Sequence, residues 1–148
     1  MIQVGQKAPD FSLVDQNGNT VTLSALKGKK VLLSWHPLAW TSVCLDQMRA
    51  LEREIETLKA KNTVALGLSV DHQPSKAAWA KFACIEETPL LADYAPLGAV
   101  AEAYGIYVAA GGHSQRANII VDENGDVAWA KCYELGELPA LNEVLAQL

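Results

Sequence analysis

The chain has 148 residues, of which 50% are hydrophobic and 20% are charged, with a formal net charge of −5 at pH 7. This length and apolar content predict a single domain over residues 1–148 and exclude a disordered chain. The acidic balance argues against nucleic-acid binding, because such proteins use basic side chains to displace phosphate counterions. No apolar run reaches the roughly 18 residues of a membrane span and the first residues lack a signal pattern, so we expect a cytoplasmic protein without membrane association.

The three cysteines, Cys44, Cys84 and Cys132, are an odd number and lie far apart in the sequence. This pattern argues against a secreted disulfide framework. The chain has no CxxC pair and no Cys/His pairs at metal-ligand spacing, so structural zinc and a thioredoxin-type dithiol both lack sequence support. The sequence therefore predicts free thiols, and the functional question is which of them is reactive.

The first half of the chain predicts a hairpin followed by a strand, a helix and a second strand. Residues 11–14 and 21–23 flank an Asn-Gly turn, which is typical of a small β-hairpin. Residues 31–35 and 64–70 are nearly unbroken apolar runs, as in strands that are covered on both faces. Between them, residues 48–58 have helical periodicity. A strand, an amphipathic helix and a strand form a βαβ unit, so these two strands should be parallel.

The second half predicts two further helices, a hairpin and a terminal helix. One helix begins at residues 74–75 and continues to Phe82, and a short one covers residues 98–104. The predicted elements after these are an antiparallel hairpin of residues 118–121 and 127–133, and a last helix through Leu138, Leu141, Val144 and Leu145. This order predicts an α/β chain with a thioredoxin-like fold, a mixed central sheet, flanking helices and an added N-terminal β-hairpin.

The segment that links the first central strand to the amphipathic helix is the candidate site. The carboxyl ends of strands in an open α/β sheet are the usual place for chemistry. Thr41 or Ser42 can cap the helix, which places Cys44 in its first turn, where unpaired N–H groups favour a thiolate. The alternative is that Cys44 is simply a core residue, because it shares a helical face with Met48 and Leu51.

Pro37, Thr41 and Cys44 match the signature Pro-x-x-x-Thr-x-x-Cys, and here the chain resembles the peroxiredoxins of the AhpC/TSA type. Further stretches resemble this family in the right order over essentially the whole chain: residues 5–13, 27–31, 68–71 and 116–122. Within the family, the chain is most similar to the AhpE-like, one-cysteine subgroup, through residues 90–93, 96–100 and 104–106. The resemblance implies a thiol peroxidase that works without metal, haem or flavin.

The resemblance also implies a role for each site residue. Cys44 would be the peroxidatic thiolate, which attacks a hydroperoxide and becomes a sulfenic acid. Arg116 would supply a fixed cation for the thiolate and for the leaving oxygen, although an arginine at a strand start is otherwise a surface residue. Thr41 would bond the thiolate and orient the peroxide, and Pro37, which has no N–H, would close the pocket.

Three positions near Cys44 in the sequence bear on the expected site and on assembly. Many members of the family have a glutamate three residues after the nucleophile, where this chain has Gln47, so we expect a weaker pairing with an arginine. Trp40 resembles the aromatic residue that many members place at a dimer interface, which implies a homodimer; the alternative is that Trp40 belongs to the local core. His36 is expected to be structural.

The other two cysteines bear on how the enzyme is reduced. Cys132 is expected to pack in its strand. Cys84 follows a helix near the place where some PrxQ-like relatives carry a resolving cysteine, so one alternative is a Cys44–Cys84 disulfide. The other is that an external thiol, from a low-molecular-weight carrier or a thioredoxin-like protein, reduces Cys44 directly. Two other functions also remain open: a redox sensor that oxidises a partner protein, and a disulfide reductase, which Gln47 disfavours because that enzyme needs a cysteine there.

Overall fold

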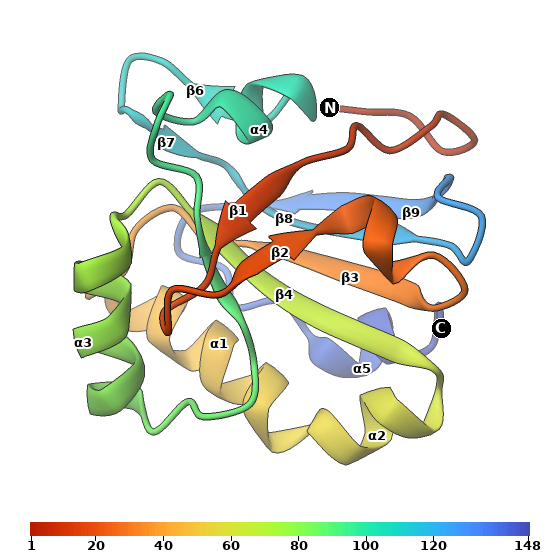
Figure 1. Cartoon of the computed structure of the whole chain (residues 1–148), viewed down its shortest axis with the longest axis horizontal. Coiled ribbons are helices and arrows are strands. Elements are labelled where there is room, and N and C mark those ends of the chain that lie inside the picture. Colours follow the sequence, from red (N-terminus) through yellow and green to blue (C-terminus); the bar gives the residue numbers. More distant parts are fainter.

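The computed structural model describes all 148 residues, and its centre is a five-stranded mixed sheet (Figure 1). Its strands are β3 (Lys30–Trp35), β4 (Thr63–Ser69), β5 (Leu90–Ala92), β8 (Arg116–Val121) and β9 (Val127–Tyr133). Their order across the sheet is β5-β4-β3-β8-β9. Strands β3, β4 and β5 are parallel, whereas β8 is antiparallel to both β3 and β9. The predicted mixed sheet and its parallel βαβ unit are confirmed.

The remaining elements surround this sheet. Two small antiparallel sheets are formed by β1 (Ser12–Val14) with β2 (Thr20–Thr22) and by β6 (Tyr107–Val108) with β7 (His113–Ser114). The helices are η1 (Leu23–Leu26), α1 (Ser42–Arg53), α2 (Ile55–Ala60), α3 (Gln73–Ala83), α4 (Ala99–Ala103) and α5 (Leu141–Leu145). The predicted N-terminal hairpin is therefore present. Strand β5 and the small β6–β7 sheet were not among the predicted elements.

Two helix predictions are wrong at their boundaries. The helix expected over residues 48–58 is divided at Glu54, whose backbone leaves the helical region, so that α1 ends and α2 begins there. Leu51 and Leu58 are nevertheless both buried, because each short helix turns its own apolar side toward the sheet. Leu138 lies outside the last helix and is exposed, since the following Pro139 disfavours a helical conformation in the residue before it.

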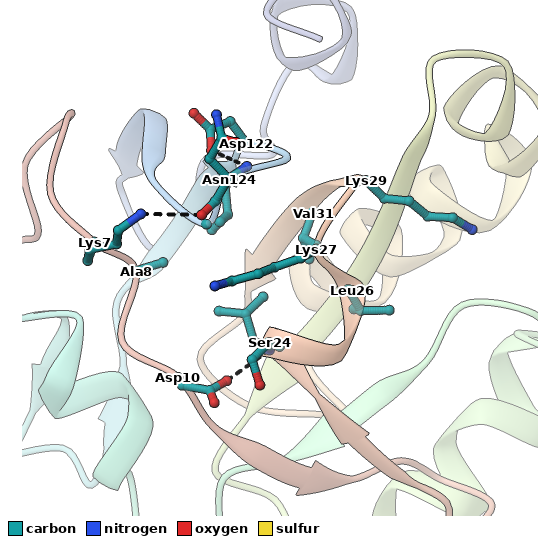
Figure 2. Close-up of a pocket in the computed structure, with 13 residues that line it drawn as sticks. Lys7, Ala8, Asp10, Ser24, Leu26, Lys27, Lys29, Val31, Asp122 and Asn124 are labelled. Carbon is teal, nitrogen blue, oxygen red and sulfur yellow. Dashed lines mark hydrogen bonds between the residues drawn. The ribbon is translucent and has the colours of Figure 1, made fainter.

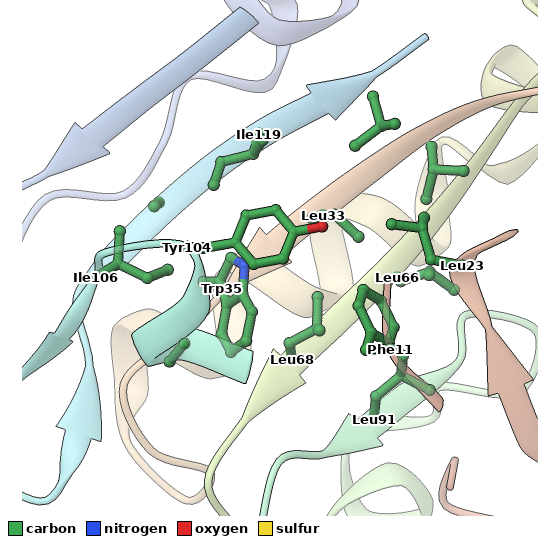
Figure 3. Packing of buried hydrophobic residues seen from close by; sticks show 14 of the residues in the cluster. Phe11, Leu23, Leu33, Trp35, Leu66, Leu68, Leu91, Tyr104, Ile106 and Ile119 are labelled. Atoms are coloured by element: carbon green, nitrogen blue, oxygen red, sulfur yellow. The ribbon is translucent and has the colours of Figure 1, made fainter. Parts of the chain in front are cut away.

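The sheet separates two hydrophobic clusters. Helices α1, α2, α3 and α5 cover one face, and the β1–β2 hairpin and α4 lie on the other (Figure 1). Figure 3 shows the hairpin-side cluster, in which Trp35 and Tyr104 have ring centroids 6.3 Å apart. Both faces of the sheet are thus covered, which explains why residues 31–35 of β3 are a nearly unbroken apolar run. No helix is both long and apolar enough to span a membrane.

Candidate active site

Cys44 lies directly beyond the carboxyl end of β3. The strand ends at Trp35, a loop follows, and α1 begins at Ser42, so that Cys44 is in the first turn of this helix. Its side chain is only 1% exposed and belongs to the helix-side cluster. The two sequence interpretations of Cys44, a core residue and a residue at a helix start, therefore describe the same position.

Arg116 reaches Cys44 although it is 72 residues away in the sequence. It begins β8, which runs antiparallel to β3 with Ala117 opposite Trp35, so the start of β8 lies beside the end of β3. The Arg116 Nη1 atom is 3.4 Å from Cys44 Sγ, and its Nη2 atom donates to the carbonyl oxygen of Leu135 at 2.6 Å. Arg116 is 2% exposed, so the surface alternative for this residue is excluded.

Gln47 holds the same guanidinium. Its Oε1 atom accepts a hydrogen bond of 2.7 Å from Arg116 Nη1, while its Nε2 atom donates to Ser34 Oγ at 2.8 Å. The amide is therefore oriented by the sheet and pairs directly with the arginine. Because Gln47 carries no charge, it does not compete with a Cys44 thiolate for the positive charge of Arg116.

Thr41 and Pro37 lie in the loop before α1. Thr41 occupies the N-cap position, but neither the predicted side-chain capping bond nor the expected bond to the Cys44 sulfur is formed. Its hydroxyl donates instead to the carbonyl oxygen of Leu38 at 2.8 Å. This bond consumes the hydroxyl proton and leaves the oxygen available as an acceptor. Thr41 is exposed and Pro37 is buried, so the loop has one polar side chain open to solvent and one enclosed proline.

A carboxylate that sequence reasoning overlooked fixes this loop. Asp71 Oδ2 accepts hydrogen bonds from the backbone N–H of Ala39 at 2.8 Å and from Ser69 Oγ at 2.6 Å. Ala39 is buried between Pro37 and Thr41, so Asp71 ties the middle of the loop to the end of β4. Ser69 and Asp71 lie in residues 68–71, a stretch that was singled out in the sequence only for its family resemblance. Nothing in the sequence indicated the hydrogen bond between Asp71 and Ala39.

Two further titratable side chains are fully buried near the site. His36 has no hydrogen-bond partner on either ring nitrogen, and burial first, then the charge of Lys76, lowers its pKa well below the usual value. Lys76 lies on α3 and is 0% exposed. The sequence does contain a signal for Lys76, because it shares a helical face with Trp79, Ala80 and Ala83, all of which are buried.

All three cysteines are free thiols, and no disulfide joins either of the others to Cys44. Cys84 is exposed and ends α3 with a φ of 57°. Cys132 is half-buried in β9, where burial raises its pKa and so keeps the thiol protonated. Trp40 is 52% exposed and its ring centroid is 5.7 Å from that of Phe82, so the alternative of local core packing for Trp40 is wrong.

A pocket lies at the other end of β3 from Cys44. Figure 2 shows a pocket of about 200 Å³ around Lys7 and Lys27, next to Val31 at the opposite end of β3 from the thiol. Lys7 is already paired there with Asp126 at 2.8 Å. No three His, Cys, Asp or Glu side chains are grouped as metal ligands. The reactive arrangement is therefore the one around Cys44 and Arg116.

The model of the AhpC/TSA family matches residues 4–130. The chain belongs to this family of peroxiredoxins. This peroxiredoxin is 37% identical to alkyl hydroperoxide reductase E of Mycobacterium tuberculosis over 139 residues, which cover 93% of the chain and 90% of that protein. It is 35% identical to peroxiredoxin 2 of Thermoplasma acidophilum over 88% of the chain and 66% of the relative.

Solved structures agree with this assignment. The reduced 2-Cys peroxiredoxin of Plasmodium vivax superimposes with a TM-score of 0.87 and 28% identity, covering 98% of this chain and 79% of that one. AhpC of Enterococcus faecalis gives a TM-score of 0.90 at 24% identity, over 99% and 90% of the two chains, and so supports the fold. The expected thioredoxin-like fold of this peroxiredoxin is confirmed.

Proposed function

We propose that Cys44 is the peroxidatic residue with which this enzyme reduces hydrogen peroxide and organic hydroperoxides. The observation that carries the proposal is the 3.4 Å contact between Cys44 Sγ and Arg116 Nη1 inside a buried site. A guanidinium remains charged at every physiological pH and is held here by two further acceptors, so it offers a fixed positive charge to a thiolate.

In the reaction, the Cys44 thiolate attacks one oxygen of the hydroperoxide. The new S–O bond forms as the O–O bond breaks, which leaves Cys44 as a sulfenic acid and releases hydroxide or an alkoxide that takes up a proton from solvent. Arg116 stabilises the negative charge first on sulfur and then on the leaving oxygen. No cofactor takes part in this step.

Thr41 and Pro37 complete the proposed site. With its proton already donated to Leu38, the Thr41 oxygen is set to accept a hydrogen bond from the peroxide and so to orient it. Pro37 is buried and has no N–H, so it limits access without adding a competing donor.

The sulfenic acid must then be reduced by a thiol. Cys44 is buried, whereas Cys84 is exposed at the end of α3, and no disulfide joins them. This arrangement favours an external thiol, from a low-molecular-weight carrier or a thioredoxin-like protein, over Cys84 as the resolving residue. Three unpaired cysteines also suit a reducing compartment such as the cytoplasm.

We also propose that residues 1–148 act as one domain and that two copies form a homodimer near the active site. Trp40 and Phe82 contact each other and remain 52% and 60% exposed. Large aromatic side chains exposed together are typical of protein interfaces. Neither nucleic acid nor a membrane is a proposed partner.

The test compares Cys44→Ser with Cys132→Ser. Cys44→Ser should abolish consumption of hydrogen peroxide with a thiol reductant while circular dichroism remains unchanged, and Cys132→Ser should retain turnover. Peptide mass spectrometry of the wild type after one equivalent of peroxide should show sulfenic acid on Cys44 with Cys84 still reduced. Undiminished turnover by Cys44→Ser would refute the proposed function. A disulfide-linked Cys44–Cys84 peptide would make Cys84 the resolving residue. A trapped mixed disulfide with a partner protein, together with slow turnover, would indicate a redox sensor.

A further inference from the structure

Lys76 is a buried cation to which the proposed mechanism gives no role. Its side chain is 0% exposed, on the side of α3 that faces the sheet. The ammonium group donates a hydrogen bond of 2.5 Å to the carbonyl oxygen of Leu91 in β5, and no carboxylate lies within salt-bridge distance. A buried lysine without a directly paired carboxylate is costly for folding, so its presence calls for a reason.

Helix α3 lies against the loop of residues 36–41 on both sides of Lys76, because Trp40 Nε1 donates a hydrogen bond of 3.0 Å to Ser75 Oγ and the ring centroids of His36 and Trp79 are 5.3 Å apart. Asp71, Asp93 and Cys44 are the groups whose negative charge favours the protonated lysine. Burial acts against them and is the larger effect, which lowers the pKa of Lys76 to about 7. The lysine is therefore close to losing its proton at neutral pH.

His36 and Arg116 complete the set of titratable and charged neighbours. The positive charges of both Lys76 and Arg116 help to lower the pKa of His36, so the imidazole is neutral at neutral pH. Arg116 and protonated Lys76 are then the two buried cations that act on this region. Arg116 contacts the thiol directly, whereas the Lys76 ammonium is bonded to Leu91 and influences Cys44 only through its charge.

A second connection runs through Asp71. This carboxylate attracts the Lys76 ammonium and accepts the hydrogen bond from the N–H of Ala39 that holds the active-site loop. Asp93, by contrast, is occupied at the start of α4, where it accepts bonds from the N–H groups of Val100 and Ala101. Lys76 is thus placed to support both the charge of Cys44 and the carboxylate that positions the loop.

We propose that Lys76 is a positioning residue of the peroxidase reaction, whose buried ammonium stabilises the Cys44 thiolate and the Asp71 carboxylate that holds the active-site loop. The inference rests on the proposed role of Cys44. It implies that the reaction with peroxide depends on a proton held by Lys76, in addition to the ionisation of the thiol itself.

The test compares Lys76→Met, which removes the charge and keeps the chain length, with Lys81→Met on the exposed side of the same helix. Stopped-flow rates with hydrogen peroxide and rates of Cys44 alkylation by iodoacetamide are measured from pH 5.5 to 9. Lys76→Met should lower both rates severalfold below pH 7, because a buried positive charge that favours the thiolate is lost. The deficit should shrink at higher pH, where wild-type Lys76 is itself neutral, and Lys81→Met should behave as the wild type.

Lys76→Arg provides the second variant, because arginine keeps its charge throughout this pH range. The Lys76→Arg variant should have wild-type rates of peroxide reaction and alkylation near pH 6, and higher rates than the wild type at high pH. Wild-type alkylation profiles in both Lys76 variants, or a Lys76→Met deficit that is equal at every pH, would overturn the inference and leave Lys76 a packing residue. If the wild type itself fails to reduce peroxide, the proposed function falls, while the alkylation profile still reports whether Lys76 acts on Cys44.

Discussion

Arg116 shows how single side chains are prepared for chemistry in this enzyme. Its Nη1 atom serves both Cys44 and Gln47, and its Nη2 atom is held by the carbonyl oxygen of Leu135. A planar guanidinium can satisfy these acceptors at the same time, because its donors point in fixed directions. A lysine has the charge but not this geometry.

Arg116→Lys should therefore reduce the rate of reaction with hydrogen peroxide by about 100-fold or more, as expected when a preorganised donor is lost from the reacting atoms. The rate is measured by stopped flow, with circular dichroism to establish that the fold is retained. Arg53→Lys, on the exposed surface of α1, is the matched control and should react normally. A near-normal rate in Arg116→Lys would show that charge alone is sufficient.

Lys76 makes stability depend on pH in a defined direction. Burial lowers its pKa from 10.5 in the unfolded chain to about 7 in the fold, so between these values the unfolded chain binds the extra proton and stability rises with pH. Below about pH 7 the destabilisation is fully present. Lys76→Met should increase the free energy of unfolding at pH 6 by on the order of a few kcal/mol, and the gain should shrink toward pH 10.

Urea denaturation at several pH values measures this dependence. The exposed Lys81→Met should show no comparable trend. A gain that is the same at pH 6 and pH 10 would mean that the charge of Lys76 is not what destabilises the fold.

Among the secondary-structure elements, α1 does more than carry Cys44. Glu52, two turns after the cysteine, accepts hydrogen bonds from the backbone N–H groups of Glu86, Glu87 and Thr88, and also from the Thr88 hydroxyl. Burial acts to raise the pKa of Glu52, but these hydrogen bonds outweigh it and lower the pKa below its usual value. One carboxylate thus ties α1 to the segment between α3 and β5.

Glu52→Ala should destabilise the protein by about 1–3 kcal/mol, because the N–H groups of the 86–88 segment lose their partner. Since the folded carboxyl has a lowered pKa, its contribution is present above about pH 4.5 and is lost as the pH falls below that value. Urea denaturation at neutral and acid pH measures both effects. Glu56→Ala, which removes an exposed carboxylate of α2, should change stability little; an equal loss in both variants would contradict the proposed tie.

Helices and strands could be predicted from the sequence where their apolar residues recur at a regular spacing. The strands β3 and β4 and the helices α1 and α3 have long apolar patterns and were predicted. The three residues of β5 and the two-residue strands β6 and β7 are too short to show a period, and their pairing depends on neighbours from elsewhere in the chain. The break at Glu54 was also missed, because Leu51 and Leu58 keep one apolar face on both sides of it.

For the whole molecule, the exposed aromatic pair Trp40 and Phe82 is the feature on which the proposed homodimer rests. Trp40→Ser should shift the protein from dimer to monomer in analytical ultracentrifugation at micromolar concentration, because interfaces depend on a few large anchors. Leu138→Ser, a similarly exposed apolar side chain away from this pair, should not. A wild-type protein that sediments as a monomer would remove the proposed homodimer.

The sequence by itself determined the family, the mixed sheet and the identity of the reactive loop, because periodic burial and the spacing of Pro37, Thr41 and Cys44 are local properties of the chain. It also pointed to Arg116, but only through resemblance. What the tertiary structure decided is which distant groups meet: the antiparallel pairing of β8 with β3 brings Arg116 to Cys44, and the packing of α3 buries Lys76 against β5. Charges and hydrogen bonds act over a few ångströms in space, and the separation of two residues along the sequence does not give the distance between them in the fold.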